Sequence, residues 1–307
     1  MNKKRFAAIS LVVLVILSAG FTVFKNSGPG TAEEAAQKSR LVQAAASGDL
    51  KTVKKLTEEM SSIQFSLGPE KKTPLEYALG NGNFEVAGYL LKHGAKDGNK
   101  SGSSLLVQAA AALPEYSQTM NQSRKVRTAR LELLKQLVKR DKGGKDGRDA
   151  AGNTALHLAA GKGDGEAVSL LLKAGLNSSE RNLAGKTPVE LAVLSAKPGA
   201  VKAFAKEERS LLHTKNEENQ NLWILAATGG AHEILYYLGK HLPGFIDEQD
   251  DFGKTALMYA SEYGDAEAAA ILLEASASRD LKSKEGFTAR DYAAEWKHER
   301  ILKLLNK

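Results

Sequence analysis

The 307-residue sequence contains no cysteine, so disulfide bonds, thiolate metal sites and cysteine nucleophiles are excluded. Histidine is sparse too, and its spacing matches neither the paired ligands of a helical zinc site nor a histidine with a carboxylate held beside it. The six are His93, His157, His213, His232, His241 and His298. We therefore expect no metal, no cofactor and no catalytic residues, and the chain is not predicted to be an enzyme.

Two Gly-Lys-Thr triplets, at 185–187 and 253–255, look like the end of a phosphate-binding loop. That loop requires another glycine five residues before the first residue of the triplet. Glu180 and Glu248 occupy those positions here. Nucleotide binding through these triplets is therefore not expected.

Long apolar runs are absent except at the N-terminus, where Phe6 to Phe24 carry no charge and follow Lys3, Lys4 and Arg5. At about 1.5 Å rise per residue this run nearly crosses the roughly 30 Å hydrocarbon layer of a bilayer. We expect residues 1–24 to be a signal anchor, with a cleaved signal peptide as the alternative. The basic flank favours a single-pass protein of the cell (inner) membrane whose remainder lies on the periplasmic or extracytoplasmic side. Cleavage would instead give a secreted or periplasmic protein, and residues 25–38 are expected to form a flexible linker.

From residue 39 onward, one pattern recurs at intervals of about 33 residues. The aligned residues of its eight copies are Ser39, Thr73, Ser104, Thr154, Thr187, Asn221, Thr255 and Thr288. In the fourth copy Thr154 suits a helix N-cap, Gly163 a helix end, and the spacing of Val168, Leu171 and Leu172 a second helix with one apolar face. One such helix pair cannot cover its own apolar face, so stability must come from stacking.

Glycine precedes the aligned residue by two positions in four copies, at Gly152, Gly185, Gly253 and Gly286. The turn into the helix favours positive φ there, which glycine adopts without steric cost. Asn219 takes this place in the sixth copy, and asparagine is among the side chains that best tolerate the conformation. Lys71 takes it in the second copy, where we expect an irregular turn.

The best copies, such as Gly185-Lys-Thr-Pro-Val-Glu-Leu-Ala192 and Gly253-Lys-Thr-Ala-Leu-Met-Tyr-Ala260, resemble the ankyrin repeat, whose consensus runs Gly-x-Thr-Pro-Leu-His-x-Ala-Ala. The resemblance implies an all-α solenoid of about eight helix-turn-helix repeats forming one domain, residues 39–307. It also implies that His157 forms hydrogen bonds between neighbouring turns. The function that it implies is non-catalytic protein–protein interaction, with no small-molecule substrate.

In ankyrin arrays, partners usually meet the turn tips and the concave surface formed by the first helices. Such positions hold Phe252, Lys254, Tyr263, Phe287 and Trp296, and exposed aromatic residues in register suggest a protein-binding patch. Two alternatives stay open, namely that Trp296 packs into a terminal cap and that Phe252 and Phe287 cover each other. Trp223 falls at the leucine position of its repeat and is expected in the core.

The third copy contains an insertion near residues 113–130, followed by a basic run. Residues 124–148 hold ten Lys or Arg against three acidic residues, which gives this window the whole chain's net charge of +7. A patch of Arg124, Lys125, Arg127 and Arg130 would attract an acidic protein, a polyanion or anionic lipid, and peripheral binding of this kind is the alternative function. Nucleic acid is not expected, because no aromatic residue interleaves the charges. The patch could equally be the solvated face of an amphipathic second helix with its leucines, from Leu131 to Leu137, inward.

Overall fold

The structure is a computed structural model that describes residues 29–68, 71–96, 98, 104–112, 120–140 and 147–306. These residues contain sixteen α-helices, two short 3-10 helices and no β-strand. The chain divides into two compact units, the first ending at Gly147 and the second beginning at Arg148. The sequence predicted one repeat domain. The division falls at the end of the one long interval in the repeat pattern, and each unit is described separately below.

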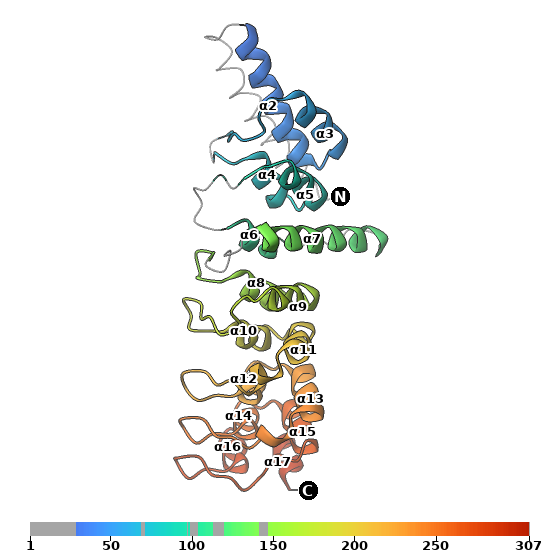
Figure 1. Cartoon of the computed structure of the whole chain (residues 1–307). Coiled ribbons are helices and arrows are strands. Elements are labelled where there is room, and N and C mark those ends of the chain that lie inside the picture. The colour runs from blue at the N-terminus through green and yellow to red at the C-terminus, as the bar shows by residue number, and fades with distance from the viewer. Residues whose placement is uncertain are drawn as a thin grey trace. The chain divides into compact units, whose positions relative to one another are not determined.

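In its described residues, the N-terminal unit contains three helix pairs (Figure 1). They are α2 (Pro29–Ser47) with α3 (Leu50–Glu59), α4 (Pro74–Gly80) with α5 (Phe84–Lys92), and α6 (Leu105–Ala111) with α7 (Met120–Arg140). First helices pack on first helices, α2 on α4 and α4 on α6, and second helices pack in the same way, α3 on α5 and α5 on α7. Each pair thus buries the apolar face that its neighbour leaves open.

Helix α2 begins earlier than the repeat pattern predicted. Ser39 lies inside it rather than at its N-cap, and the expected linker, 25–38, is helical from Pro29 onward. The reason lies in the alanine- and glutamate-rich composition of residues 32–37, which favours helix, together with an ion pair one turn apart between Glu34 and Lys38 at 2.5 Å. Residues 25–28 lie outside the described part of the chain.

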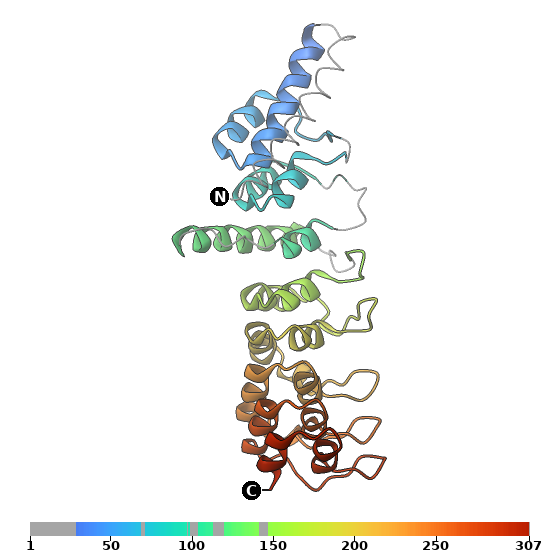
Figure 2. The same cartoon turned by 180° about the vertical axis from the view of Figure 1, so that it is seen from behind.

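The C-terminal unit contains five helix pairs (Figures 1 and 2). They are α8 (Ala155–Lys162) with α9 (Gly165–Lys173), α10 (Pro188–Leu194) with α11 (Pro198–Glu207), α12 (Leu222–Thr228) with α13 (His232–His241), α14 (Ala256–Glu262) with α15 (Ala266–Glu274), and α16 (Ala289–Glu295) with α17 (Glu299–Leu305). The 3-10 helices η2 (Arg209–His213) and η3 (Pro243–Phe245) follow α11 and α13. Trp223 is buried in this core, as predicted.

Seven of the eight aligned residues are helix N-caps, as the spacing predicted. In each, the side-chain oxygen accepts a hydrogen bond from the backbone N–H three residues later. They are Thr73, Ser104, Thr154, Thr187, Asn221, Thr255 and Thr288. Because such a cap contributes about 1 kcal/mol, the repeated Thr position is explained by local chemistry.

The turns before these caps have the predicted backbone. φ is +75° at Gly152, +69° at Gly185 and +57° at Asn219. Lys71 adopts the same conformation, with φ of +50°. The turn nevertheless differs from the others, as predicted. Its closing hydrogen bond, from Leu67 N to Lys72 O, spans one residue more than the bond from Asp149 N to Asn153 O, and Gly68 also has a positive φ, +79°.

Helix α7 is the amphipathic second helix that the sequence predicted for the third repeat. Leu133, Leu134 and Leu137 are buried. It has 21 residues, whereas α3 has 10 and α5 has 9. The part of the insertion that the structure describes, residues 120–130, therefore lengthens α7 at its N-terminal end, and residues 113–119 lie outside the described part.

None of the helices in the described ranges is long and apolar enough to cross a bilayer. The expected anchor, residues 1–24, lies outside those ranges. The prediction of a membrane segment therefore stays a prediction.

Candidate functional site

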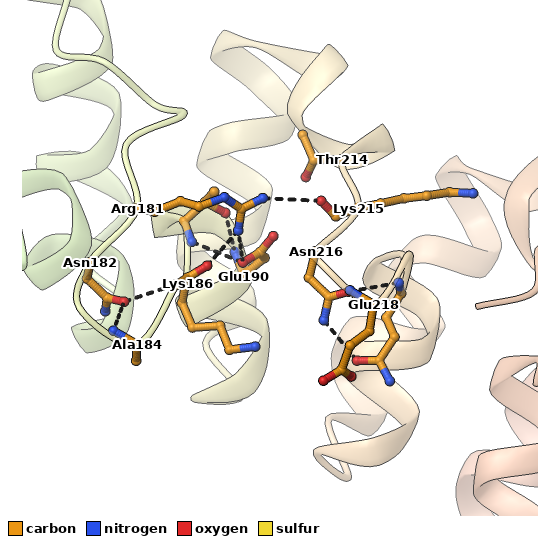
Figure 3. Close-up of polar contacts among 12 residues, drawn as sticks. Arg181, Asn182, Ala184, Lys186, Glu190, Thr214, Lys215, Asn216 and Glu218 are labelled. Carbon is orange, nitrogen blue, oxygen red and sulfur yellow. Dashed lines mark hydrogen bonds and ion pairs between the residues drawn. The ribbon is translucent and has the colours of Figure 1, made fainter. Parts of the chain in front are cut away.

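Each first helix of the C-terminal unit is preceded by a projecting turn, called a finger here (Figure 1). The five fingers are residues 149–153, 182–186, 216–220, 250–254 and 283–287. In the first four, the opening Asp or Asn accepts hydrogen bonds from the backbone N–H groups two and four residues later, at 2.8 to 3.0 Å. Figure 3 shows these bonds in the second and third fingers, at Asn182 and Asn216. The short polar side chain thus fixes each turn.

Long side chains tie the first, second and fourth fingers to the next finger, and the backbone bond from Asp251 N to Glu218 O, at 3.1 Å, ties the third to the fourth. Arg148 donates to its own finger at Gly152 O (2.8 Å) and to the next repeat at Arg181 O (2.9 Å). Arg181 repeats this with Gly185 O and Lys215 O (Figure 3), and Gln249 with Gly253 O and Lys282 O. Backbone bonds add to the row, such as Lys284 N to Phe252 O at 3.0 Å. The fingers therefore form one hydrogen-bonded edge.

Two buried side chains behind the fingers differ in how many of their polar atoms have a hydrogen-bond partner. His157 accepts or donates at Thr154 Oγ1 (2.8 Å), and its Nε2 lies 2.9 Å from Lys186 O in the next repeat, as the resemblance implied. Burial lowers the pKa of His157. The equivalent residue one repeat later is Glu190, whose Oε2 accepts from Thr187 N at 3.0 Å and faces Arg181 at 3.4 Å. Its other oxygen, Oε1, is buried and has no hydrogen-bond partner.

The predicted aromatic residues lie at two ends of the first helices α14 and α16. Phe252 and Phe287 belong to the last two fingers, and Tyr263 and Trp296 are the C-cap residues of α14 and α16. Their exposed fractions are 56% for Phe252, 41% for Phe287, 59% for Tyr263 and 60% for Trp296. Phe287 packs edge-on against Tyr292 at 5.6 Å between ring centroids. Sequence reasoning missed Leu183, which is 81% exposed in the second finger and could have been found from its position before a turn glycine.

Lys254, in the fourth finger, lies between Tyr259 of its own repeat and Tyr292 of the next. Its ammonium lies 4.5 Å from the Tyr292 ring centroid and 5.3 Å from that of Tyr259, and 2.9 Å from a Glu262 oxygen. Only 15% of the side chain is exposed. Burial lowers the pKa of Lys254, but the hydrogen bond and charge of Glu262 outweigh it, so the pKa is raised overall. Lys254 is therefore a partly buried cation with a fixed position. Together with Tyr259 and Tyr292 it forms the surface between the exposed aromatic residues, which is called the floor here.

The two tyrosines under Lys254 are also fixed by hydrogen bonds. The Tyr259 hydroxyl donates to Asp250 Oδ2 at 2.6 Å, and the Tyr292 hydroxyl donates to Glu285 Oε2 at 3.0 Å. Burial and the Asp250 carboxylate raise the pKa of Tyr259. The floor between the exposed aromatic residues thus consists of neutral, immobilised rings and one paired cation. Within the described ranges, no group of three or more His, Asp or Glu side chains is arranged to hold a metal ion.

The predicted basic patch is smaller than its sequence suggested. Arg124, Lys125 and Arg127 are exposed on α7, but Arg130 is buried. Its guanidinium donates to Ala109 O at 3.0 Å and Ala110 O at 2.8 Å, near the C-terminal end of α6. The last carbonyls of a helix have no partner within the helix, and Arg130 supplies one. It is a structural residue and does not contribute to the surface charge.

Fold and surface together define a helical repeat protein. The family model for ankyrin repeats (3 copies) matches residues 41–119, 124–215, 195–279 and 222–307. Because these matches cover most of the sequence, the chain belongs to the ankyrin-repeat family. Ankyrin repeats bind proteins, and the family is in general one of non-enzymatic interaction modules.

Three similar proteins illustrate the relationship. Neurogenic locus notch homolog protein 1 of Xenopus laevis is 29% identical over 142 residues, 46% of this chain and 6% of that protein. A transient receptor potential cation channel subfamily A member 1 homolog of Caenorhabditis elegans is 28% identical over 221 residues, 69% of this chain and 16% of that one. The crystal structure of EF0377, an ankyrin repeat protein, superimposes with a TM-score of 0.54 at 26% identity, covering 68% of this chain and 98% of that chain. The chain thus spans less than a fifth of these two curated relatives.

Proposed function

We propose that the C-terminal unit binds a partner protein across α14 and α16, between the last two fingers and the C-terminal ends of these helices. The observation that carries the proposal is the placement of four exposed aromatic residues in two consecutive repeats, Phe252 and Tyr263 in one, Phe287 and Trp296 in the next. Aromatic residues dominate the energetics of protein interfaces. In the described part of the chain, every exposed large apolar side chain lies in this unit.

The hydrogen-bonded edge supports this assignment for an energetic reason. Ordering loops and side chains on binding costs free energy, about 0.5 to 1.5 kcal/mol for each mobile side chain. The fingers are held by Asp250 and by the bond from Lys284 N to Phe252 O before any partner arrives. The partner would therefore meet a preformed surface, with aromatic anchors on both sides of the Lys254 and Tyr292 floor.

The proposal is tested with the triple variant Phe252→Ala, Tyr263→Ala and Phe287→Ala. Proximity labelling in cells identifies partners of the unaltered protein, and the affinity of each is then measured for both forms. We expect a loss of at least about 2 kcal/mol, the size of an interface hot spot. Tyr236→Ala is the control, because Tyr236 is an exposed aromatic residue on α13, a second helix. Partners that bind the triple variant with unchanged affinity would refute the assignment.

The proposal includes a membrane anchor at residues 1–24, with the repeats on the periplasmic or extracytoplasmic side. Its support is the uncharged run from Phe6 to Phe24 behind three basic residues. Intact mass, membrane fractionation and protease accessibility test it together. A mature protein that lacks residues 1–24 would favour secretion after cleavage, and a membrane-bound protein whose repeats are protected on the cytoplasmic side would refute the orientation.

A further inference from the structure

A groove of about 910 Å³ lies on the second helices of the N-terminal unit, formed by α3, α5 and α7. It is separate from the aromatic surface of the C-terminal unit. Leu50, Phe84, Tyr89 and Ala129 line it with apolar atoms. A smaller hollow of about 190 Å³ shares Phe84 and Ala129 with the groove and extends to Gly48 and Asn83, in the turns before α3 and α5. The lengthened N-terminal end of α7 forms one wall, because Arg124, Lys125, Thr128 and Ala129 all line the groove.

The rim of the groove carries an excess of positive charge. Four cations line it, Lys54, Lys92, Arg124 and Lys125. Lys125 lies 3.2 Å from the carboxylate of Glu85, and the other lining carboxylate, Glu132, lies 3.7 Å from Lys135. Both acidic residues of the rim are therefore already paired. Lys54, Lys92 and Arg124 are exposed, and among the described residues no carboxylate lies within ion-pair distance of them.

We propose that this α3–α5–α7 groove binds an acidic amphipathic segment of a partner protein. An amphipathic helix recognises a groove through apolar residues spaced one turn apart. Its apolar face would contact the partly exposed Leu50, Tyr89 and Ala129, and its carboxylates would pair with Lys54, Lys92 and Arg124. The groove volume of about 910 Å³ lies in the range of binding sites that enclose several groups the size of a side chain.

Two observations favour a protein segment over a membrane or a nucleic acid. The described residues of the N-terminal unit expose no large hydrophobic side chain that could insert between lipid chains. Of the two aromatic residues of the groove, Phe84 is buried, and the half-buried Tyr89 ring has His93 stacked on it at 3.9 Å and the Lys54 ammonium 5.7 Å from its centroid, so neither ring is open for a base to stack on. A hollow with an apolar floor also suits inserted side chains better than a flat layer of lipid head groups.

The test measures fluorescence anisotropy of a labelled peptide about five helical turns long, with Leu at i, i+3, i+4 and i+7 and Glu elsewhere. Two matched probes have the same composition in scrambled order, or Lys in place of Glu. We expect the acidic amphipathic peptide to bind the full-length protein at least about tenfold more tightly than either. Its affinity should fall as salt is raised, because the rim charges are exposed.

The variant Lys54→Glu, Lys92→Glu and Arg124→Glu should weaken binding at least about tenfold. Its matched control, Lys206→Glu, Lys240→Glu and Lys303→Glu, makes the same change of charge on exposed second-helix positions of the C-terminal unit and should leave affinity within about twofold. Ala129→Phe, which fills the groove and keeps every charge, should also weaken binding. Circular dichroism confirms that each variant is folded.

Several outcomes overturn the inference. These are absence of peptide binding, equal binding of the scrambled peptide, and equal weakening by the control triple. Loss of peptide binding in the Phe252, Tyr263 and Phe287 variant would place the peptide on the C-terminal unit instead. Phosphatidylserine vesicles are tested in parallel, and vesicle binding without peptide binding would identify a lipid surface and refute a protein segment.

Discussion

His157 makes the stability of the C-terminal unit depend on pH. The imidazole is fully buried and joins two repeats, because its Nε2 lies 2.9 Å from Lys186 O. Burial lowers its pKa below the ordinary value of 6.5. The folded protein therefore holds His157 neutral at a pH where the unfolded chain already binds a proton.

The sign follows from proton linkage. The unfolded state binds more protons below pH 6.5, so the free energy of unfolding decreases as the pH falls through that value and is constant above it. The slope is at most about 1.4 kcal/mol per pH unit. Between pH 7.5 and 5.5 we expect His157 to remove up to about 1.4 kcal/mol, a decrease of roughly 3 to 6 °C in Tm for a unit of this size.

The matched control is His157→Met, because methionine occupies the equivalent position in a later repeat, where Met258 packs at the N-terminus of α14. At pH 7.5 the variant should be about 1 kcal/mol less stable, since the bond to Lys186 O is lost. Its Tm should depend less on pH than that of the unaltered protein. The assay is thermal unfolding by circular dichroism from pH 5 to pH 8. Parallel curves for the two proteins over this range would refute the reasoning.

Two further predictions concern buried charges. Arg130→Met should destabilise the N-terminal unit by about 2 to 4 kcal/mol, because two α6 carbonyls lose their donors, whereas Arg127→Met on the exposed side of α7 should stay within about 0.5 kcal/mol. Chemical denaturation of both variants checks this, and equal effects would contradict it. Glu190→His should stabilise the C-terminal unit by about 1 kcal/mol at pH 8, because a donor replaces the unpartnered Oε1. A lower Tm for Glu190→His would show instead that the contact with Arg181 matters more.

The helix pairs could be predicted from the sequence because their signals are local. A cap such as Thr187 bonds to its own helix, and a turn residue such as Gly185 needs only its own φ. The cap residue is present in seven of the eight copies, and those seven caps were placed correctly, whereas the turn glycine occurs in four. The prediction of a cap at Ser39 was wrong. Ser39 lies in a run of helix-favouring residues, and helix α2 begins ten residues earlier, at Pro29.

Parts of the candidate surfaces could not be predicted, because they depend on packing between repeats. Arg130 looks like its exposed neighbours in sequence, and its burial follows from where α7 crosses the end of α6. The partial burial of Lys254 depends in the same way on Tyr292 of the next repeat. The links between fingers carried a usable signal, since Arg148, Arg181 and Gln249 each stand six residues before a cap, at Thr154, Thr187 and Thr255.

The linked fingers limit how this surface can diversify. Arg148 and Arg181 each hold two fingers at a fixed separation, so an insertion or deletion within one turn would break bonds in two repeats. In the N-terminal unit, by contrast, the described gain in length lies in helix α7, which has 21 residues where α5 has 9. New specificity in the C-terminal unit would therefore arise by exchanging tip side chains such as Leu183 or Phe252, on turns whose length stays constant.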